Sequence, residues 1–220
     1  MSNPYMDYAA QFLISEANGT LSRDQVTLVA LNDGATVLPA ATVLGQITVG
    51  TAAAMPGAGN TGTGVPGAIS LGRNATPGAY SLQCIVGGAG GSFMLFDPQG
   101  NEVGEVQVGT SFSGPLIFTL SDGATHFAVG DTFEIVVTPG SGKYREWDPN
   151  GSDGRENACA ILLASADVSG AADVQAAIIS RYAEVKNLLL NWNSAASNGQ
   201  ISAATAQLAL RGIIVRGAQA

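Results

Sequence analysis

Few residues of this 220-residue chain have the type and spacing that catalysis requires. The single histidine, His126, ends the turn Ser121-Asp-Gly-Ala-Thr-His126, and a hydrolase would need a nucleophile and a base beside it. No nucleophile elbow flanks this turn. The acids of the middle third stand at turns, where Asp is common for backbone reasons, without a nucleophile or metal motif; they are Asp97, Glu102, Glu105, Asp122 and Asp131. The chain is therefore predicted not to be an enzyme, the alternative being a hydrolase built on His126.

Three further patterns suggest a metal or phosphate site, and each lacks a required residue. The loop at residues 148–154 has oxygens at alternate positions, but Asp153 and Cys159 stand where a calcium loop needs Gly and Glu. The glycine run at residues 87–91 is followed by neither a helix start nor a lysine, which a phosphate-binding loop needs. Cys84 and Cys159 lack the spacing of metal ligands and are expected to be free thiols. No metal and no cofactor is therefore expected.

Composition excludes several classes of partner. The net charge is −8, from 9 basic and 17 acidic residues, whereas binding to nucleic acid is driven by Lys and Arg. No apolar run reaches the roughly 18 residues of a membrane-spanning helix, and we expect no signal peptide. Charged residues make up only 12% of the chain. We therefore expect neither a nucleic acid nor a membrane as partner. We also expect a surface that is covered by small polar residues or buried against other proteins.

Two glycine- and proline-rich segments, residues 55–67 and 139–142, divide the chain. Between them, short alternating segments with turn signals predict about six strands and no helix, which is typical of a small β-sandwich. These segments are residues 68–71, 79–86, 92–96, 102–108, 116–120 and 132–137. Because tolerated insertions occur where both chain ends lie close together, we predict a discontinuous host domain, 1–57 plus 141–220, carrying an inserted β-domain, 58–140.

The host domain is predicted to be mainly β with short helices. Strands are expected at residues 25–31, 42–48 and 213–215, and further structured segments without an assigned type at residues 158–164, 173–185 and 188–192. The apolar run at residues 176–179 fits either a strand buried on both faces or a short helix, and periodicity does not decide between them. One helix is predicted at residues 203–211, with Ser202 as its N-cap and Gly212 just after its end.

The N-terminal region has an unusual apolar triplet. Phe12, Leu13 and Ile14 are separated from the next apolar run at Val26 by the turn-prone Asn18-Gly19 and a polar segment. Two explanations are open: the triplet begins the first strand of the host domain, or it belongs to an arm that adds a strand to another protein's sheet. The preceding residues 3–8 carry two tyrosines and a methionine, and exposed aromatic residues favour contact surfaces.

Five segments, in this order, resemble the bacteriophage lambda-type head decoration proteins. They are Leu13-Ile-Ser-Glu-Ala-Asn-Gly-Thr-Leu-Ser-Arg-Asp24, Thr42-Val-Leu-Gly-Gln-Ile-Thr48, Trp147-Asp-Pro149 with Asp153-Gly154, Ala160-Ile-Leu-Leu163 and Leu210-Arg-Gly-Ile-Ile-Val215. The resemblance covers most of residues 12–48 and 142–216. Through residues 49–140 the chain is similar to those larger members that carry an extra β-domain at this loop.

The resemblance implies a β-tulip-like host domain and a structural virion protein. It implies homotrimers that bind the major capsid protein on the outside of an expanded phage capsid and stabilise it against the pressure of packaged DNA. The protein would be made in the bacterial host cytoplasm and would lie on the outer capsid surface.

Residue roles follow as expectations from this resemblance. Residues 1–24 would form the capsid-binding arm, and deleting them would leave the fold intact but abolish attachment. The arm's contact residues would be Phe12, Leu13, Ile14, Ser15, Glu16 and Arg23. Tyr144 and Trp147 are candidates for the trimer interface, and Trp147 equally suits a place in the core.

A carbohydrate-binding or adhesive surface module is the alternative function. The inserted β-sandwich would suit it, with Tyr80, Phe93 or Phe127 stacking on sugars. The exposure of these rings distinguishes the two functions, because a sugar-binding module presents a flat exposed aromatic cluster, whereas strand alternation places Tyr80 and Phe93 in a core.

Overall fold

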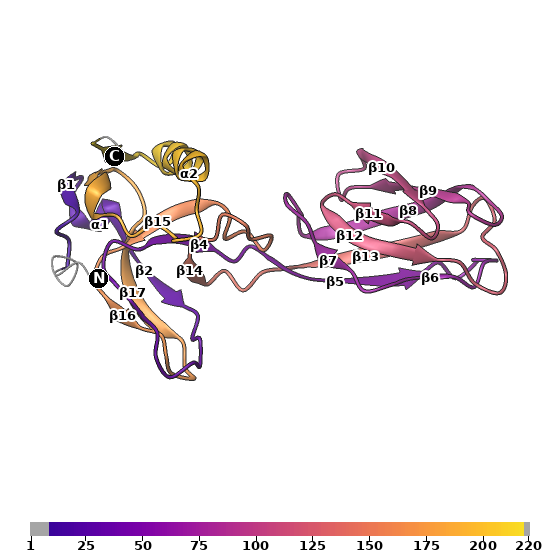
Figure 1. Ribbon diagram of the computed structural model, residues 1–220, viewed down its shortest axis with the longest axis horizontal. Coiled ribbons are helices and arrows are strands. Elements are labelled where there is room, and N and C mark those ends of the chain that lie inside the picture. The colour runs from indigo at the N-terminus through magenta and orange to yellow at the C-terminus, as the bar shows by residue number, and fades with distance from the viewer. Residues whose placement is uncertain (1–8, 218–220) are drawn as a thin grey trace. The chain divides into compact units, whose positions relative to one another are not determined.

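The computed structural model describes residues 9–217, which form two compact units (Figure 1). The host unit comprises residues 9–47 and 142–217, and the inserted unit comprises residues 48–141. Strands make up 44% and helices 10% of the protein, so the predicted class, mainly β with short helices, is confirmed.

A closed five-stranded barrel is the centre of the host unit. Its strands, in the order in which they pair, are β14 (Tyr144–Glu146), β2 (Arg23–Leu28), β17 (Val174–Ile179), β15 (Ala158–Leu162) and β4 (Val43–Gln46). Every residue of β15 is buried, which explains its unbroken apolar sequence. The ambiguous run at residues 176–179 belongs to a strand, because β17 pairs with β2 along its whole length. The strand is not buried on both faces as expected, because Ala177 is exposed.

Smaller elements flank the barrel. β1 (Leu13–Glu16) runs antiparallel to β18 (Ala183–Lys186), which is parallel to β19 (Ile213–Arg216). β3 (Val37–Leu38) pairs with β16 (Ala166–Asp167). The helices are α1 (Gly19–Ser22), the 3-10 turn η1 (Asn187–Leu189) and α2 (Asn198–Leu210). The final strand was predicted correctly.

The helix α2 begins earlier than predicted. Ser197, not Ser202, is its N-cap: the Ser197 hydroxyl accepts a hydrogen bond from the Gln200 N–H, and the Gln200 side chain accepts one from the Ser197 N–H. This reciprocal pair outweighs the weak helix propensity of Asn198 and Gly199. At the other end, Gly212 has a φ of +73°, as a glycine after a helix terminus usually does.

Two apolar clusters fill the host unit. One contains Phe12, Trp147 and the buried side of α2, and the Trp147 and Trp192 rings meet edge to face with centroids 5.8 Å apart. The other fills the barrel around Leu28, Leu44 and Ile178. Strands from both halves of the host sequence contribute to each cluster.

The inserted unit is a sandwich of two sheets around one core. The five-stranded sheet has the order β10 (Glu102–Gln107), β9 (Ser92–Phe96), β8 (Gly78–Val86), β13 (Thr132–Pro139) and β5 (Val49–Pro56). In the second sheet, β12 (Leu116–Ser121) pairs with β11 (Ser111–Ser113), β6 (Val65–Pro66) and β7 (Ser70–Leu71). Phe93 and Phe127 pack edge to face in the core at 4.9 Å.

The first boundary of the inserted unit lies earlier than the predicted position between residues 57 and 58. β5 pairs with β13 from Val49 to Pro56, so these residues belong to the inserted sandwich. The glycine- and proline-rich segment at residues 55–67 is therefore mostly a loop within this unit rather than a linker before it.

A buried carboxylate holds that loop. Asp131 is only 3% exposed and accepts hydrogen bonds from the N–H groups of Thr61, Gly62 and Ala128 at 2.8, 2.8 and 3.0 Å. Burial alone would raise the pKa of Asp131, but these backbone hydrogen bonds outweigh it and lower the pKa below its ordinary value. The ionised form therefore ties residues 61 and 62 to the turn before β13.

Asp131→Asn should destabilise the inserted unit. The Asp131 pKa is lower in the folded chain, so ionised Asp131 stabilises the fold above the ordinary carboxyl pKa of about 4, and this contribution is lost as the pH falls through the folded-state value. Each hydrogen bond to a charged group contributes about 1.5–3 kcal/mol, so we expect the variant to lose at least about that much free energy of unfolding near neutral pH. We also expect its free energy of unfolding to fall less than that of the parent when the pH is lowered. Urea unfolding near neutrality and at about pH 3 measures both effects. Glu105→Gln, at an exposed position, is the control; an Asp131→Asn variant as stable as the parent would contradict this role.

Excising the inserted unit at its observed boundaries should leave a folded host unit. The two chain ends that the excision leaves lie next to each other in the host unit. The Gly142 N–H donates to the Ile47 carbonyl at 2.9 Å, and the Ile47 N–H donates to the Lys143 carbonyl at 2.9 Å. A short Gly/Ser linker in place of residues 48–141 should therefore preserve cooperative thermal unfolding. Replacing only residues 58–140 would leave β5 without β13 and should promote aggregation. Non-cooperative melting of the first variant would show that the two units depend on one core.

Candidate functional site

The apolar triplet near the N-terminus is part of the host unit and not a free arm. Phe12 is 1% exposed within the cluster of Trp147, its carbonyl accepts from the Lys186 N–H at 2.8 Å, and β1 pairs with β18. Leu13 is half-buried against the same cluster. The free-arm hypothesis is therefore wrong for residues 12–24, and the first-strand explanation is correct. The predicted arm residues 1–8 lie outside the described residues.

The polar residues assigned to the arm are held by partners within the host unit. Glu16 forms an ion pair with Arg23, and the hydrogen bond from Arg23 is the main reason that the pKa of Glu16 is lowered. The Ser15 hydroxyl donates to Glu184 at 2.9 Å, and Glu184 also accepts from Arg216 at 3.0 Å. Ser15, Glu16 and Arg23 thus fix β1 and α1 in place, and their contact with a capsid remains a prediction.

Three large exposed side chains lie on the same segments as these ion pairs. Ile14, Leu21 and Tyr182 are 49%, 51% and 55% exposed. Two hydrogen bonds bring the segment of Tyr182 against α1 and against the residue that follows β1: the Ala17 N–H donates to the Tyr182 carbonyl at 2.9 Å, and Arg181 Nε donates to the Leu21 carbonyl at 3.0 Å. We call Ile14, Leu21, Tyr182, Arg23 and Arg181 the β1 surface.

Tyr182 is held in a conformation that tyrosine rarely adopts. Its φ is +50°, in the left-handed region, which costs a residue with a side chain about 1–3 kcal/mol. Its ring lies against Gly212, where an added Cβ would come within 2.9 Å of the Tyr182 ring. Glycine at 212 therefore makes room for the ring. Strain of this kind, together with a half-exposed aromatic ring, is typical of binding surfaces.

Ion pairs stand on the segments that form the β1 surface. Arg181 makes two contacts of 2.7 Å to the Asp24 carboxylate, and hydrogen bonds, with that from Ser180 the strongest, lower the pKa of Asp24. Glu16–Arg23 and Glu184–Arg216 are two further ion pairs on these segments. Sequence patterns did not indicate Leu21 and Tyr182 as contact residues. Leu21 lies in the segment that resembles the decoration proteins but was not among the residues assigned to the arm, and the strain at Tyr182 depends on the close approach of Gly212.

The two candidates for the trimer interface differ in position. Trp147 is 2% exposed, and its indole N–H donates to the Glu156 carbonyl at 3.0 Å, so it is a core residue and not an interface residue. Tyr144 is half-buried on β14, between β4 and β2, and burial raises the pKa of its hydroxyl. Tyr144 remains a predicted interface residue.

Other chemically suggestive residues do not assemble into a site. His126 Nδ1 lies 2.7 Å from Asp122, and within the described chain no serine, threonine or cysteine side chain is hydrogen-bonded to the imidazole. Cys84 and Cys159 are both buried, and burial raises the pKa of Cys159 to about 11. Within residues 9–217, no group of three His, Cys, Asp or Glu side chains is placed to hold a metal. No helix of this range is long and apolar enough to cross a membrane.

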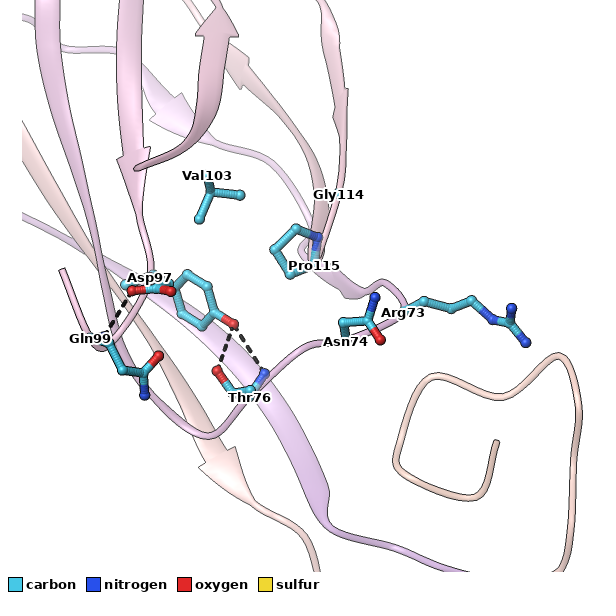
Figure 2. A pocket seen from close by; sticks show the side chains of 9 residues that line it. Arg73, Asn74, Thr76, Asp97, Gln99, Val103, Gly114 and Pro115 are labelled. Carbon is cyan, nitrogen blue, oxygen red and sulfur yellow. Dashed lines mark hydrogen bonds between the residues drawn. The ribbon is translucent and has the colours of Figure 1, made fainter. Parts of the chain in front are cut away.

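The inserted unit has an open pocket of about 400 Å³, shown in Figure 2. The Tyr80 hydroxyl beside it is already bonded to Thr76, whose N–H lies 3.0 Å away. Asp97 is likewise bonded to the Gln99 and Asn101 N–H groups within its own turn. The aromatic rings proposed to stack on sugars are all buried in the core; they are Tyr80, Phe93 and Phe127. The pocket therefore lacks the flat aromatic surface that a carbohydrate-binding module needs.

The host unit thus combines a closed barrel with exposed apolar side chains on the segments of β1, α1 and residue 182, which also carry ion pairs. The family model of bacteriophage lambda head decoration protein D matches residues 6–86 and 100–213. The chain therefore belongs to the lambda head decoration protein D family, whose members decorate phage heads. The match extends beyond residues 12–48 and 142–216, into most of the inserted unit.

Solved structures resemble the chain only weakly. Two crystal structures of FlgL from Xanthomonas campestris are 21% and 20% identical, with TM-scores of 0.33 and 0.32, over 48% of this chain and 34% and 33% of FlgL. The flagellar hook junction protein FlgK from Burkholderia pseudomallei is 23% identical, with a TM-score of 0.32, over 61% of this chain and 22% of FlgK. The chain thus spans about a third or less of these proteins, and no function is transferred from them. No curated protein matches the chain.

Substitutions at Phe12, just before β1, and at Ile14 within it should show which side chain belongs to the core and which to the surface. Phe12→Ala should lower the free energy of unfolding of the host unit by about 3–5 kcal/mol, because it empties a fully buried site. Ile14→Ser, at an exposed position, should change it by no more than about 0.5 kcal/mol. For the same reason, a chain lacking residues 1–24 should fail to fold, since it loses β1 and the start of β2 from the host unit. Equal stability of the Phe12 and Ile14 variants in urea unfolding would contradict this assignment.

Proposed function

We propose that the protein binds the major capsid protein on the outside of an expanded phage capsid as a homotrimer and stabilises the shell against internal DNA pressure. Membership of the head decoration family supports a role on the capsid. The observation that carries the proposed contact is the strained, half-exposed Tyr182, whose segment lies against that of the exposed Leu21 and against the end of β1, the strand that carries the exposed Ile14. We assign the capsid contact to the β1 surface and the trimer contact to other parts of the host unit, Tyr144 among them.

The energetics of the β1 surface suit a contact that is weak singly and durable in multiples. Fully burying a large apolar side chain is worth roughly 1.5–3 kcal/mol, and Ile14, Leu21 and Tyr182 each have about half of their surface available. A trimer carries three such surfaces. Once one has bound, the others act at an effective concentration of roughly millimolar order, so modest contacts combine into a durable clamp.

The ion pairs give the contact its orientation. Glu16–Arg23 and Asp24–Arg181 are partly exposed to solvent and stand on the same segments as the exposed apolar side chains. Charges at the rim of an interface contribute little affinity, but they suppress wrong partners and fix register. The net charge of −8 favours the outer, protein face of the shell over contact with packaged DNA.

The N-terminal residues extend this surface in sequence. Residues 1–8 immediately precede the described chain and carry two tyrosines and two methionines. We propose that they add to the contact made by the β1 surface, while residues 12–24 act as its fixed base. The free arm proposed from the sequence is thereby limited to these residues.

Substitutions in the β1 surface should reduce capsid binding without unfolding the protein. Ile14→Ser, Leu21→Ser and Tyr182→Gly each remove apolar contact area, and glycine adopts the positive φ of residue 182 without strain. We expect the triple variant to melt like the parent and to sediment with undecorated capsids far less completely.

Val129→Ser is the matched control, because Val129 is an exposed aliphatic residue of the inserted unit. It should bind as the parent does, and saturated capsids should carry three copies per binding site. Full capsid binding by the triple variant would refute the assignment of the contact to the β1 surface. Single copies on saturated capsids would refute the trimer.

A further inference from the structure

One edge of the inserted sandwich lacks the usual protection against pairing with another strand. β5 is the terminal strand of the five-stranded sheet; its sequence Val49-Gly-Thr-Ala-Ala-Ala-Met-Pro56 contains no charged residue (Figure 1). Native edge strands are usually short, charged, bulged or interrupted by proline. In β5 the single proline stands at the last position, and the one register irregularity of its pairing with β13 lies between Val49 and Ala52, so residues 52–56 form a regular edge.

The other edges of the same sandwich are protected. β10, at the opposite end of the five-stranded sheet, carries Glu102 and Glu105 and has an irregular register near Gly104. In the second sheet, β11 has three residues, and β6 and β7 have two each. β5 is therefore the long, uncharged exception among the described edges.

The backbone of β5 presents unpaired groups outward. The Gly57 N–H donates to the Thr132 carbonyl at 2.9 Å, and residues on an antiparallel strand alternate between facing the partner and facing away. The backbone groups of Met55 and Ala53 therefore face β13, whereas the N–H and C=O groups of Ala52 and Ala54 point away from it. No loop or side-chain hydrogen bond found within residues 9–217 reaches either alanine.

We infer that β5 pairs antiparallel with β5 of a second copy of this chain, across a two-fold axis at Ala53. The edge is self-complementary: the outward donors and acceptors of Ala52 match those of Ala54 in the second copy. The methyl side chains of residues 52–54 allow the two backbones to approach closely.

Charge supports a second copy as the occupant. The inserted unit carries six acids against Arg73, so two copies repel wherever their acids meet. None of these acids lies on β5. Glu102 and Glu105 stand on β10 at the opposite edge, and Glu134 stands on the neighbouring strand β13. The remaining acids lie outside the strands; they are Asp97, Asp122 and Asp131. The β5 edge is thus where two copies of this acidic unit approach with the least repulsion.

The pairing adds contacts between neighbouring trimers and rests in part on the proposed function. The outward-facing groups of two alanines per strand form only a short ladder of backbone hydrogen bonds, which is weak by itself. A capsid surface would hold the copies at high local concentration and so favour the pairing. The decoration layer would then be joined through its inserted units as well as fixed to the shell through its host units.

Cross-linking at the two-fold axis tests the inference. The pair Ala53–Ala53 would be a non-hydrogen-bonded pair with Cα atoms about 4.5 Å apart, within the range that a disulfide spans. Ala53→Cys should therefore form disulfide dimers under mild oxidation, both in concentrated solution and on capsids. The native Cys84 and Cys159 are buried, so they should not compete. Glu105→Cys, on the opposite edge, is the matched control and should give several-fold less dimer.

A charge variant separates pairing from folding. Ala53→Lys places two like charges opposite each other and should prevent association in concentrated solution, whereas Ala53→Ser should not; both should melt like the parent, since Ala53 is exposed. Dimer yields for Ala53→Cys no higher than for Glu105→Cys in both settings would overturn the inference, as would cross-linking to the capsid protein instead. Dimers in solution from a protein that does not sediment with capsids would retain the pairing and refute the proposed function.

Discussion

The host unit depends on pairing between the two distant ends of its sequence. β2, near the N-terminus, closes the barrel by pairing with β17 on one side and β14 on the other, and β1 pairs with β18. This closure requires the chain to leave and re-enter the host unit at one point, where the Gly142 N–H meets the Ile47 carbonyl. An inserted unit of 94 residues (48–141) is compatible with the barrel because its ends meet there.

The same closure explains the candidate contact surface. With Phe12 buried against Trp147 and Arg23 at the start of a barrel strand, β1 and α1 are held rigidly, and ion pairs from Glu16, Asp24 and Glu184 reinforce them. A rigid base presents Ile14, Leu21 and Tyr182 without a large ordering cost on binding, which favours affinity. The strain at Tyr182 is sustained by this surrounding structure.

Local patterns predicted the β class, most strands, the end of α2 and the inserted sandwich. These features depend on alternating side chains and turn residues, which can be recognised within a few neighbouring residues of the sequence. Long-range contacts decided the rest. The burial of Phe12 depends on β18 and α2, the first boundary depends on β5 pairing with β13, and the start of α2 depends on the reciprocal bonds of Ser197 and Gln200. Tyr182 gave no sequence signal, since its conformation arises only where Gly212 approaches it.

Amide hydrogen exchange of the protein, free and bound to capsids, tests the central claim that a rigid host unit makes the contact through the β1 surface. The account predicts slower exchange on binding at residues 14–23 and 181–184, with the barrel strands β4 and β15 unchanged. Slowed exchange confined to other parts of the host unit, or to the inserted unit, with residues 14–23 unaffected, would contradict it.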